Sequence, residues 1–264
     1  MNNKTILTLT AQYVITLTIF SGITAFSLPV YAQSPTVSVT PSAQSALRSQ
    51  AVINRLKGRA DAEITRRVTA LNRILDKINA MKRLTADQKT TFTNGIQGQI
   101  SSLTNLKTKI DADTDLSTLR TDVQSIVKSY RIFALYLPQV NIMSNADRAL
   151  AIIAEMSTIS TKLQTRIDAA KSAGNDTTAM QSLMTDRASK LADATTQAQN
   201  ALNTVVPLTP DGYPGNKTTL LSARTMLQTV RSDLKAAESD ATTVRQDLHS
   251  MKKTTATSTA TPTP

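Results

Sequence analysis

One long helical pattern constrains the fold of this chain more than any other feature. Residues 42–83 contain no proline, and their apolar residues recur at steps of three, four or seven. These positions are Ile53, Leu56, Ala60, Ile64, Leu71, Ile74, Ile78 and Met81. At ~1.5 Å per residue the segment would form a helix ~60 Å long, which exceeds an ordinary globular helix. Such a helix has to bury its apolar stripe against other long helices.

The rest of the chain repeats this pattern in shorter segments. We expect further helices at 86–110, 116–137, 144–173, 177–206 and 218–251. Pro138, Gly174 and Pro207 mark three of the expected ends, because proline cannot continue a helix and glycine commonly follows one. Tryptophan is absent and other aromatic residues are few, which disfavours sheets.

The sequence therefore predicts an all-α fold, an elongated up-and-down antiparallel bundle of five to six long helices with coiled-coil-like packing. We expect one helical domain over 42–253, with the proline- and glycine-rich loop 207–216 as a possible sub-boundary. The Thr/Pro-rich segment 254–264 is typical of a disordered tail.

The N-terminal segment 1–32 has the pattern of a signal peptide. After Lys4 the chain runs without charge to Val30, and Ala32 supplies the small residue that a signal peptidase requires. We expect cleavage after Ala32 and a flexible leader at 33–41. The alternative is a retained membrane anchor, since ~20 apolar residues suffice to span a bilayer. Both interpretations place the helical domain in the periplasm, at the cell surface or in the extracellular space.

Composition argues against catalysis. The chain has no cysteine and one histidine, His249, near the end of the last expected helix. Disulfides and cysteine-based metal sites are thereby excluded. No phosphate-binding loop or catalytic motif is present, so we expect a protein that is not an enzyme and has no cofactor.

A turn rich in aspartate could in principle hold Ca²⁺. Asp111, Asp113 and Asp115 alternate along it, but the glycine and distal glutamate of an EF-hand loop are missing. Capping of the next helix by Thr114 or Asp115 is the favoured interpretation. We assign no metal site.

A row of basic residues is the main candidate for binding. Six Arg and Lys positions of the first helix fall within a ~40° sector, and the apolar positions centre on the opposite side. They are Arg48, Arg55, Arg59, Arg66, Arg73 and Lys77. The row suits an anionic cell-wall polymer or anionic lipid head groups. Nucleic acid is disfavoured, because no aromatic residues interleave the row to stack on bases. Alternatively, this is a solvated face, partly paired with acids such as Asp61 and Glu63.

The segment Leu84-Thr85-Ala86-Asp87-Gln88 offers a second interpretation. It matches the L-T-x-x-Q motif and, with export, helicity and basic charge, resembles the Spy-like periplasmic chaperones. That resemblance implies an ATP-independent chaperone with protein clients. The motif occurs once here, whereas the family carries it twice. Leu84, Thr85 and Gln88 also fit a helix cap, with Thr85 as N-cap and Gln88 completing a capping box.

Three aromatic residues, Tyr130, Phe133 and Tyr136, gather at the end of the third expected helix. This helix end is apolar on nearly all sides, which is typical of a segment buried in a core. A surface for a protein partner is the alternative.

Taken together, these patterns favour an exported, non-catalytic helical protein that binds an anionic macromolecule or partner through a basic helix face. A Spy-like chaperone is the second candidate, and a structural or assembly component, including a coiled-coil homo-oligomer, is the third. More broadly, the chain resembles exported all-helical bacterial proteins without an assigned activity.

Overall fold

The computed structural model describes residues 41–128 and 130–258, and within them the side chains of 42–128 and 130–251. This part of the chain is helical and contains no strand, which confirms the all-α prediction. The six α-helices are α1 (Pro41–Ala80), α2 (Ala86–Ala112), α3 (Leu116–Lys128), α4 (Leu137–Ser172), α5 (Thr178–Val205) and α6 (Asn216–Ser258). A π-helix, η1 (Ile132–Tyr136), precedes α4, and a 3₁₀ turn, η2 (Pro210–Gly212), precedes α6.

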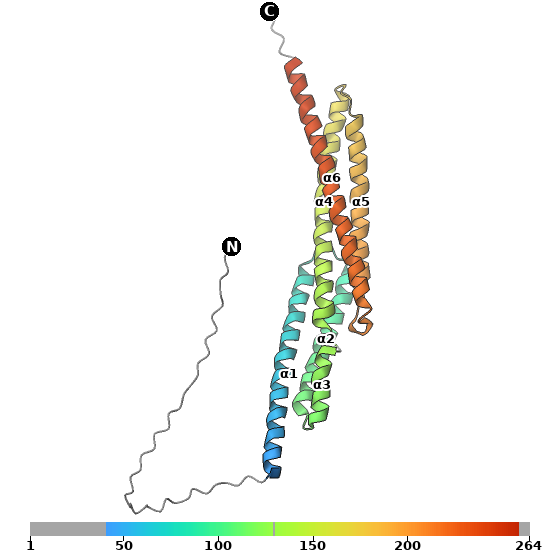
Figure 1. Cartoon of the computed structure of the whole chain (residues 1–264). Helices are drawn as coiled ribbons and strands as arrows, with labels where there is room; N and C mark the ends of the chain where they lie inside the picture. The colour runs from blue at the N-terminus through green and yellow to red at the C-terminus, as the bar shows by residue number, and fades with distance from the viewer. Residues whose placement is uncertain (1–40, 129, 259–264) are drawn as a thin grey trace, which may run out of the picture.

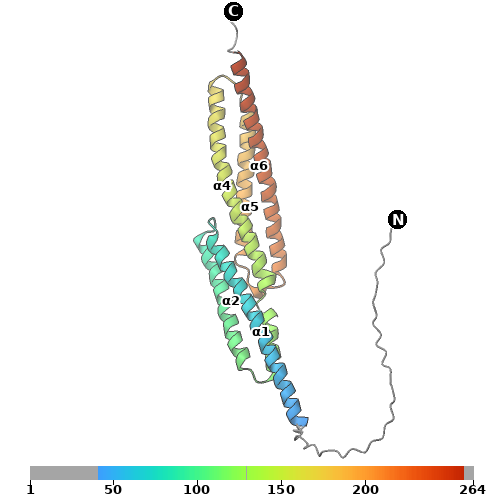
Figure 2. The same ribbon diagram turned by 90° about the vertical axis from the view of Figure 1, so that its left-hand side faces the viewer.

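The helices form an elongated bundle with two three-helix layers placed end to end (Figure 1). In Figure 1, α1, α2 and α3 make up the lower layer, and α4, α5 and α6 make up the upper one. Successive helices run up and down within each layer, whereas α4 continues in the direction of α3. Turned by 90°, the view shows the upper end of the α1–α2 hairpin beside the base of α4 and α5 (Figure 2). The result is a rod with an overlap at its middle.

The apolar periodicity of α1 places its core as expected. Of the eight positions that define it, Leu56 is half-buried and the other seven are buried. A single contiguous core cluster runs from α1 to α6, and a smaller second cluster lies towards the ends of α4 and α6. Alanines at the contact of α5 and α6, such as Ala198 and Ala237, are completely buried and let the two backbones approach closely.

The prediction of one continuous helix over 116–137 is wrong in its second half. α3 ends at Lys128, Arg131 adopts a left-handed conformation with φ 43°, and the chain then forms the π-helix η1. The segment is apolar on nearly all sides, so its periodicity carries no signal for a break. Pro138 does not stop a helix, because it lies in the first turn of α4, where its missing N–H needs no partner.

The expected ends of α2, α4 and α5 agree with the structure to within two residues. Two other expected bounds are wrong: α4 begins at Leu137 and not at 144, and α6 extends to Ser258, seven residues beyond the expected end and into the predicted Thr/Pro tail. Gly174 ends α4 with φ +86°, a conformation that favours glycine. The N–H of Asn175 then donates to the carbonyl of Ala170 over 3.1 Å. This pattern satisfies carbonyl groups that the helix end leaves without partners.

Hydrogen bonds attach α4 to two of the connections between helices. The buried amide nitrogen of Gln139 donates to the carbonyl oxygens of Val205, at 2.8 Å, and Leu208, at 3.0 Å. The backbone N–H of Arg83 donates to Oδ1 of Asp147 over 2.6 Å. These contacts tie the α1–α2 and α5–α6 connections to α4.

The expected signal peptide, 1–32, and nearly all of the leader, 33–41, lie outside the described residues. α6 extends to Ser258, and 259–264 of the Thr/Pro tail also lie outside. Within the described residues, no helix combines the length and the hydropathy that crossing a membrane requires.

Candidate polyanion-binding surface

All six basic residues of the predicted row are exposed along α1. We call them the basic edge: Arg48, Arg55, Arg59, Arg66, Arg73 and Lys77. At ~1.5 Å per residue, the row extends for roughly 44 Å. Except for Arg66, its members form no ion pair or side-chain hydrogen bond with any described residue. Their charges are therefore available to a ligand in solvent.

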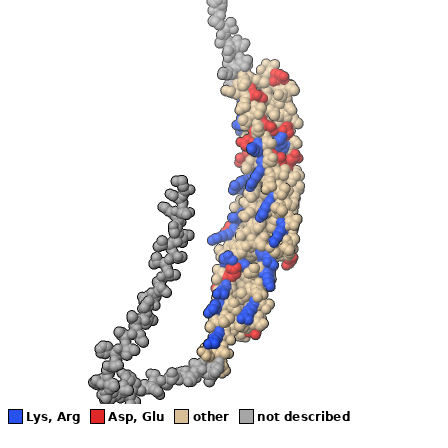
Figure 3. All heavy atoms as spheres, in the orientation of Figure 1, with Lys and Arg blue, Asp and Glu red and all other residues tan. Residues whose placement is uncertain are grey.

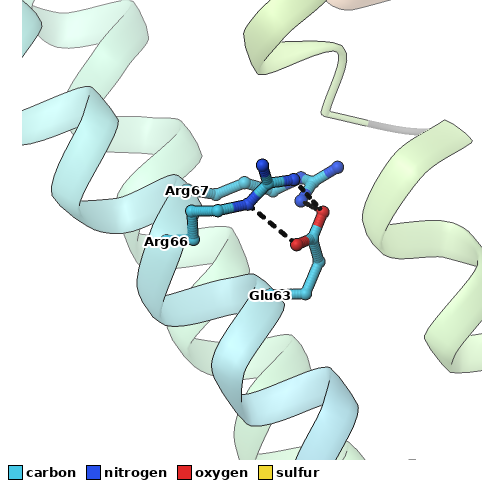
Figure 4. Close-up of polar contacts among 3 residues, drawn as sticks. All are labelled: Glu63, Arg66 and Arg67. Carbon is cyan, nitrogen blue, oxygen red and sulfur yellow. Dashed lines mark hydrogen bonds and ion pairs between the residues drawn. The ribbon is translucent and has the colours of Figure 1, made fainter.

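Arg66 shows that the basic edge borders the packed face of α1. Its guanidinium pairs with Glu63, over 2.7 and 2.9 Å, and lies 4.5 Å from the ring centroid of Phe133. Figure 4 shows Glu63, Arg66 and Arg67 projecting from α1 towards the break that follows α3. At 100° per residue the edge is roughly 115° from the apolar stripe, so it flanks the stripe and does not oppose it.

Arg67 accounts for the position of Glu63. Arg67 is buried, and burial lowers the pKa of its guanidinium. The same Glu63 carboxylate accepts hydrogen bonds from Arg67 and Arg66, and Arg67 lies 5.2 Å from the Phe133 centroid. Glu63 thus compensates a buried charge and is not available to neutralise the rest of the edge.

Asp61, the other acid expected beside the row, is engaged elsewhere. Its carboxylate pairs with Nζ of Lys107 on α2 over 2.7 Å, and Lys107 also pairs with Asp111 over 3.1 Å. The two hydrogen bonds raise the pKa of Lys107. Asp61 therefore links α1 to α2 and pairs with no member of the basic edge.

The structure also contains a basic row that the sequence analysis missed. On α6, Lys217, Arg224, Arg231 and Arg245 recur at multiples of seven residues, with Glu238 in the same register. Heptad spacing drifts by only ~20° per repeat and so keeps these side chains near one face, a signal that could have revealed them. Figure 3 shows Lys and Arg gathered along the lower layer and continuing over α4 and α6 on the same face.

The three aromatic residues do not form one cluster. Tyr136 is buried and packs edge-to-face on Phe92 of α2, with centroids 6.1 Å apart. Burial raises the pKa of Tyr136 to about 12. Phe133 lies under the two guanidinium groups at the surface, and Tyr130 is half-buried. Tyr136 thus belongs to the core and Tyr130 packs against it, whereas Phe133 lies at the surface.

The LTxxQ-like segment forms a complete capping box at the start of α2. The N–H of Gln88 donates to Oγ1 of Thr85 over 3.1 Å, and the N–H of Thr85 donates to Oε1 of Gln88 over 3.0 Å. Gln88 also donates to Oδ1 of Asn203 over 2.9 Å, and Leu84 is buried. These contacts give all three motif residues a structural role.

The aspartate-rich turn caps a helix, as favoured from the sequence. Oδ2 of Asp115 accepts a hydrogen bond from the N–H of Thr118 over 2.8 Å, and this bond lowers the pKa of Asp115. Asp122 of α3 pairs with Lys109 over 2.9 Å. No group of acidic or histidine side chains able to hold a metal ion occurs in the part of the chain that the structure describes.

Comparisons with protein-family models, with curated proteins and with solved structures find no match for this chain.

Proposed function

We propose that this protein is an exported, non-catalytic binding protein that holds a linear anionic polymer of the cell envelope along its basic edge. The proposal rests on the exposure of the basic side chains and on the contacts that the acids of the same helix make. The side chains of the basic edge are exposed on a single helix, and two of the three acids of that helix, Asp61 and Glu63, are occupied by Lys107, Arg66 and Arg67. The third acid, Asp76, is exposed between Arg73 and Lys77 and leaves the excess of positive charge on this edge large.

The shape of the surface favours a linear ligand. The six cations lie along a straight helix of roughly 44 Å, spaced by four or seven residues, so neighbouring charges are roughly 6 to 11 Å apart. A polymer with regularly spaced phosphate or carboxylate groups can meet several of them at once. A small anion would meet one or two.

The net charge of +11 supports this proposal further. A basic protein attracts polyanions at long range, and the attraction weakens as salt screens it. An N-terminal export signal, expected over 1–32, would bring the protein to compartments where such polymers occur.

The proposal can be tested by measuring binding of the full chain to long-chain polyphosphate, a soluble linear polyanion, at low salt. In the test variant Arg55, Arg59, Arg73 and Lys77 are changed to glutamate. Arg66 stays unchanged because it belongs to the contact with Glu63 and Phe133. We expect binding to fall by more than about tenfold, a loss of more than about 1.4 kcal/mol.

A matched control reverses four exposed basic residues elsewhere: Arg120, Lys162, Arg166 and Lys171. It changes the net charge equally, so it should bind much more tightly than the test variant. Equal losses in both variants would mean that net charge, not the basic edge, governs binding. Preferential binding to anionic-lipid vesicles would mean that the ligand is a membrane surface and not a polymer. Suppression of client aggregation that the test variant retains would favour the chaperone alternative.

A further inference from the structure

A groove between α4 and α6 is lined by both apolar and basic side chains, whereas the basic edge consists of basic side chains alone. Three adjoining hollows of about 260, 200 and 260 Å³ follow one another along it. The first two share Asn145, Leu227 and Arg231, and the last two share Ile152. We call this surface the α4–α6 groove.

The floor of the α4–α6 groove is largely apolar, although the buried Arg187 of α5 lies at the bottom of the third hollow. Its larger apolar residues are Ile142, Ile152, Met156, Ile159, Leu227 and Leu234. Two of them stay unusually exposed for large aliphatic side chains, Ile152 at 39% and Ile159 at 46%. These two residues are seven positions apart on α4, so they face the same side of the helix. A partner that covered them would remove apolar surface from water.

The walls of the α4–α6 groove are basic. Arg148 of α4 and Arg224, Arg231 and Arg245 of α6 line its hollows, whereas Glu238 is the only acidic residue among the described residues that line them. Arg148, Arg224 and Arg231 form no ion pair with described residues, and Arg245 hydrogen-bonds only to the carbonyl of Ala241 and the hydroxyl of Thr242. The walls therefore carry uncompensated positive charge.

We propose that the α4–α6 groove binds an amphipathic helix of a partner protein, with acidic residues flanking its apolar stripe. The groove follows α4 from Ile142 to Ile159, ~25 Å at 1.5 Å per residue, which matches about five helical turns. A helix lying there would complete a four-helix arrangement with α4, α5 and α6, and its apolar stripe would cover Ile152 and Ile159. Its acids would meet the arginines of both walls.

Charge argues against the chain filling the groove with its own terminal segments. Residues 1–40 contain one charged residue, Lys4, and 259–264 contain none. Neither segment can supply the acids that the walls require. A second copy is disfavoured by the net charge of +11 on each chain.

The test uses a designed, fluorescein-labelled peptide of three heptads, with Leu at a and d and Glu at e and g, titrated with the full chain. Fluorescence anisotropy should show saturable one-to-one binding. A peptide with Lys at e and g, and a scrambled peptide of identical composition, should each bind at least about tenfold more weakly. Tight binding of the scrambled peptide would overturn the proposal, because the groove would then recognise charge without helical pattern.

Two protein variants locate the binding. Arg224→Glu combined with Arg231→Glu should weaken peptide binding at least about tenfold, and Ile152→Lys should do the same through the floor. All three positions are exposed, so circular dichroism should show unchanged melting. Full affinity in either variant would contradict the proposal. So would a monomer–dimer equilibrium that Ile152→Lys abolishes, because the occupant would then be a second copy.

The basic-edge variant, with Arg55, Arg59, Arg73 and Lys77 changed to glutamate, separates this inference from the polymer proposal. It should lose polyphosphate and keep the peptide. Loss of the peptide in this variant alone would place the peptide on α1 and end the groove proposal.

Discussion

The Arg66 guanidinium lies 4.5 Å from the centroid of the Phe133 ring, which joins the basic edge of α1 to the π-helix η1. The same ring lies 5.2 Å from the buried Arg67. A cation above an aromatic face is attracted by the ring's electron density. Phe133 thus holds two like charges next to each other, together with the carboxylate of Glu63.

Replacing Phe133 should weaken this contact in a graded way. We expect Phe133→Leu to lower the free energy of unfolding by about 1 kcal/mol, because leucine keeps apolar contact but has no ring. Phe133→Tyr retains the ring and should stay close to the wild type. Urea denaturation followed by circular dichroism measures both. Equal stability of the leucine variant would show that the ring contributes only its apolar surface.

Asp113 gives the protein a specific pH dependence. Burial, and then the nearby carboxylate of Asp122, raise the pKa of Asp113. Neither Oδ2 of Asp113 nor Oδ2 of Asp122 has a hydrogen-bond partner among the described residues. The folded state therefore binds a proton more tightly than the unfolded state, so this group destabilises the fold as pH rises through the raised pKa.

Asp113→Asn should consequently be more stable than the wild type at neutral pH. Its advantage should shrink as pH falls through the raised pKa, and it should disappear below the unfolded-state value of about 3.9. Unfolding by urea at several pH values between 7 and 3, roughly the range over which carboxylates titrate, measures the difference. An advantage that grew on acidification would have the wrong sign for this explanation.

Arg187 of α5 occupies a position in the helix core where an apolar residue would be expected. It is 1% exposed and donates to the hydroxyl of Ser160 and to the carbonyls of Met156 and Ala237. Burial lowers the pKa of Arg187, because removing the guanidinium from water disfavours its charged form. No carboxylate hydrogen-bonds to it within the described part of the chain.

Two substitutions separate the packing of Arg187 from its charge. Arg187→Ala should lower the free energy of unfolding by about 3 kcal/mol, because it leaves a cavity between three helices. Arg187→Met fills most of that space without a buried charge, so it should change stability by less than about 1 kcal/mol. Denaturant unfolding of both variants provides the measurement. If methionine were as destabilising as alanine, the three hydrogen bonds would be the dominant contribution.

The sequence predicted helices where apolar periodicity was clear and helix ends at Gly174 and Pro207, but Pro138, the third expected end, lies in the first turn of α4. α1 follows from its stripe of eight apolar positions, and the end of α4 follows from Gly174. The break after Lys128 could not be predicted, because a segment apolar on all sides has no periodicity to interrupt. The basic edge was visible as a spacing, but the diversion of Asp61 and Glu63 to other cations depends on tertiary contacts.

The capping box at Thr85 provides a control on the interpretation of the LTxxQ-like motif. Thr85→Ala should lower the free energy of unfolding by about 1 kcal/mol, whereas Thr85→Ser should preserve it, since serine retains the accepting hydroxyl. Thermal melts compare the two variants. A chaperone role for the motif would instead predict a loss of client protection in both variants at equal stability.

The salt dependence of polyphosphate binding tests the central claim most directly. Each cation that neutralises a phosphate releases counterions, so log K falls linearly with log salt concentration. Changing Arg55, Arg59, Arg73 and Lys77 to glutamine should reduce the slope by about 3, since each contact contributes about 0.7 for single-stranded polyanions. The matched glutamine variant at Arg120, Lys162, Arg166 and Lys171 should keep the wild-type slope. Equal slopes in all three proteins would contradict the proposal that the basic edge is where the polymer binds.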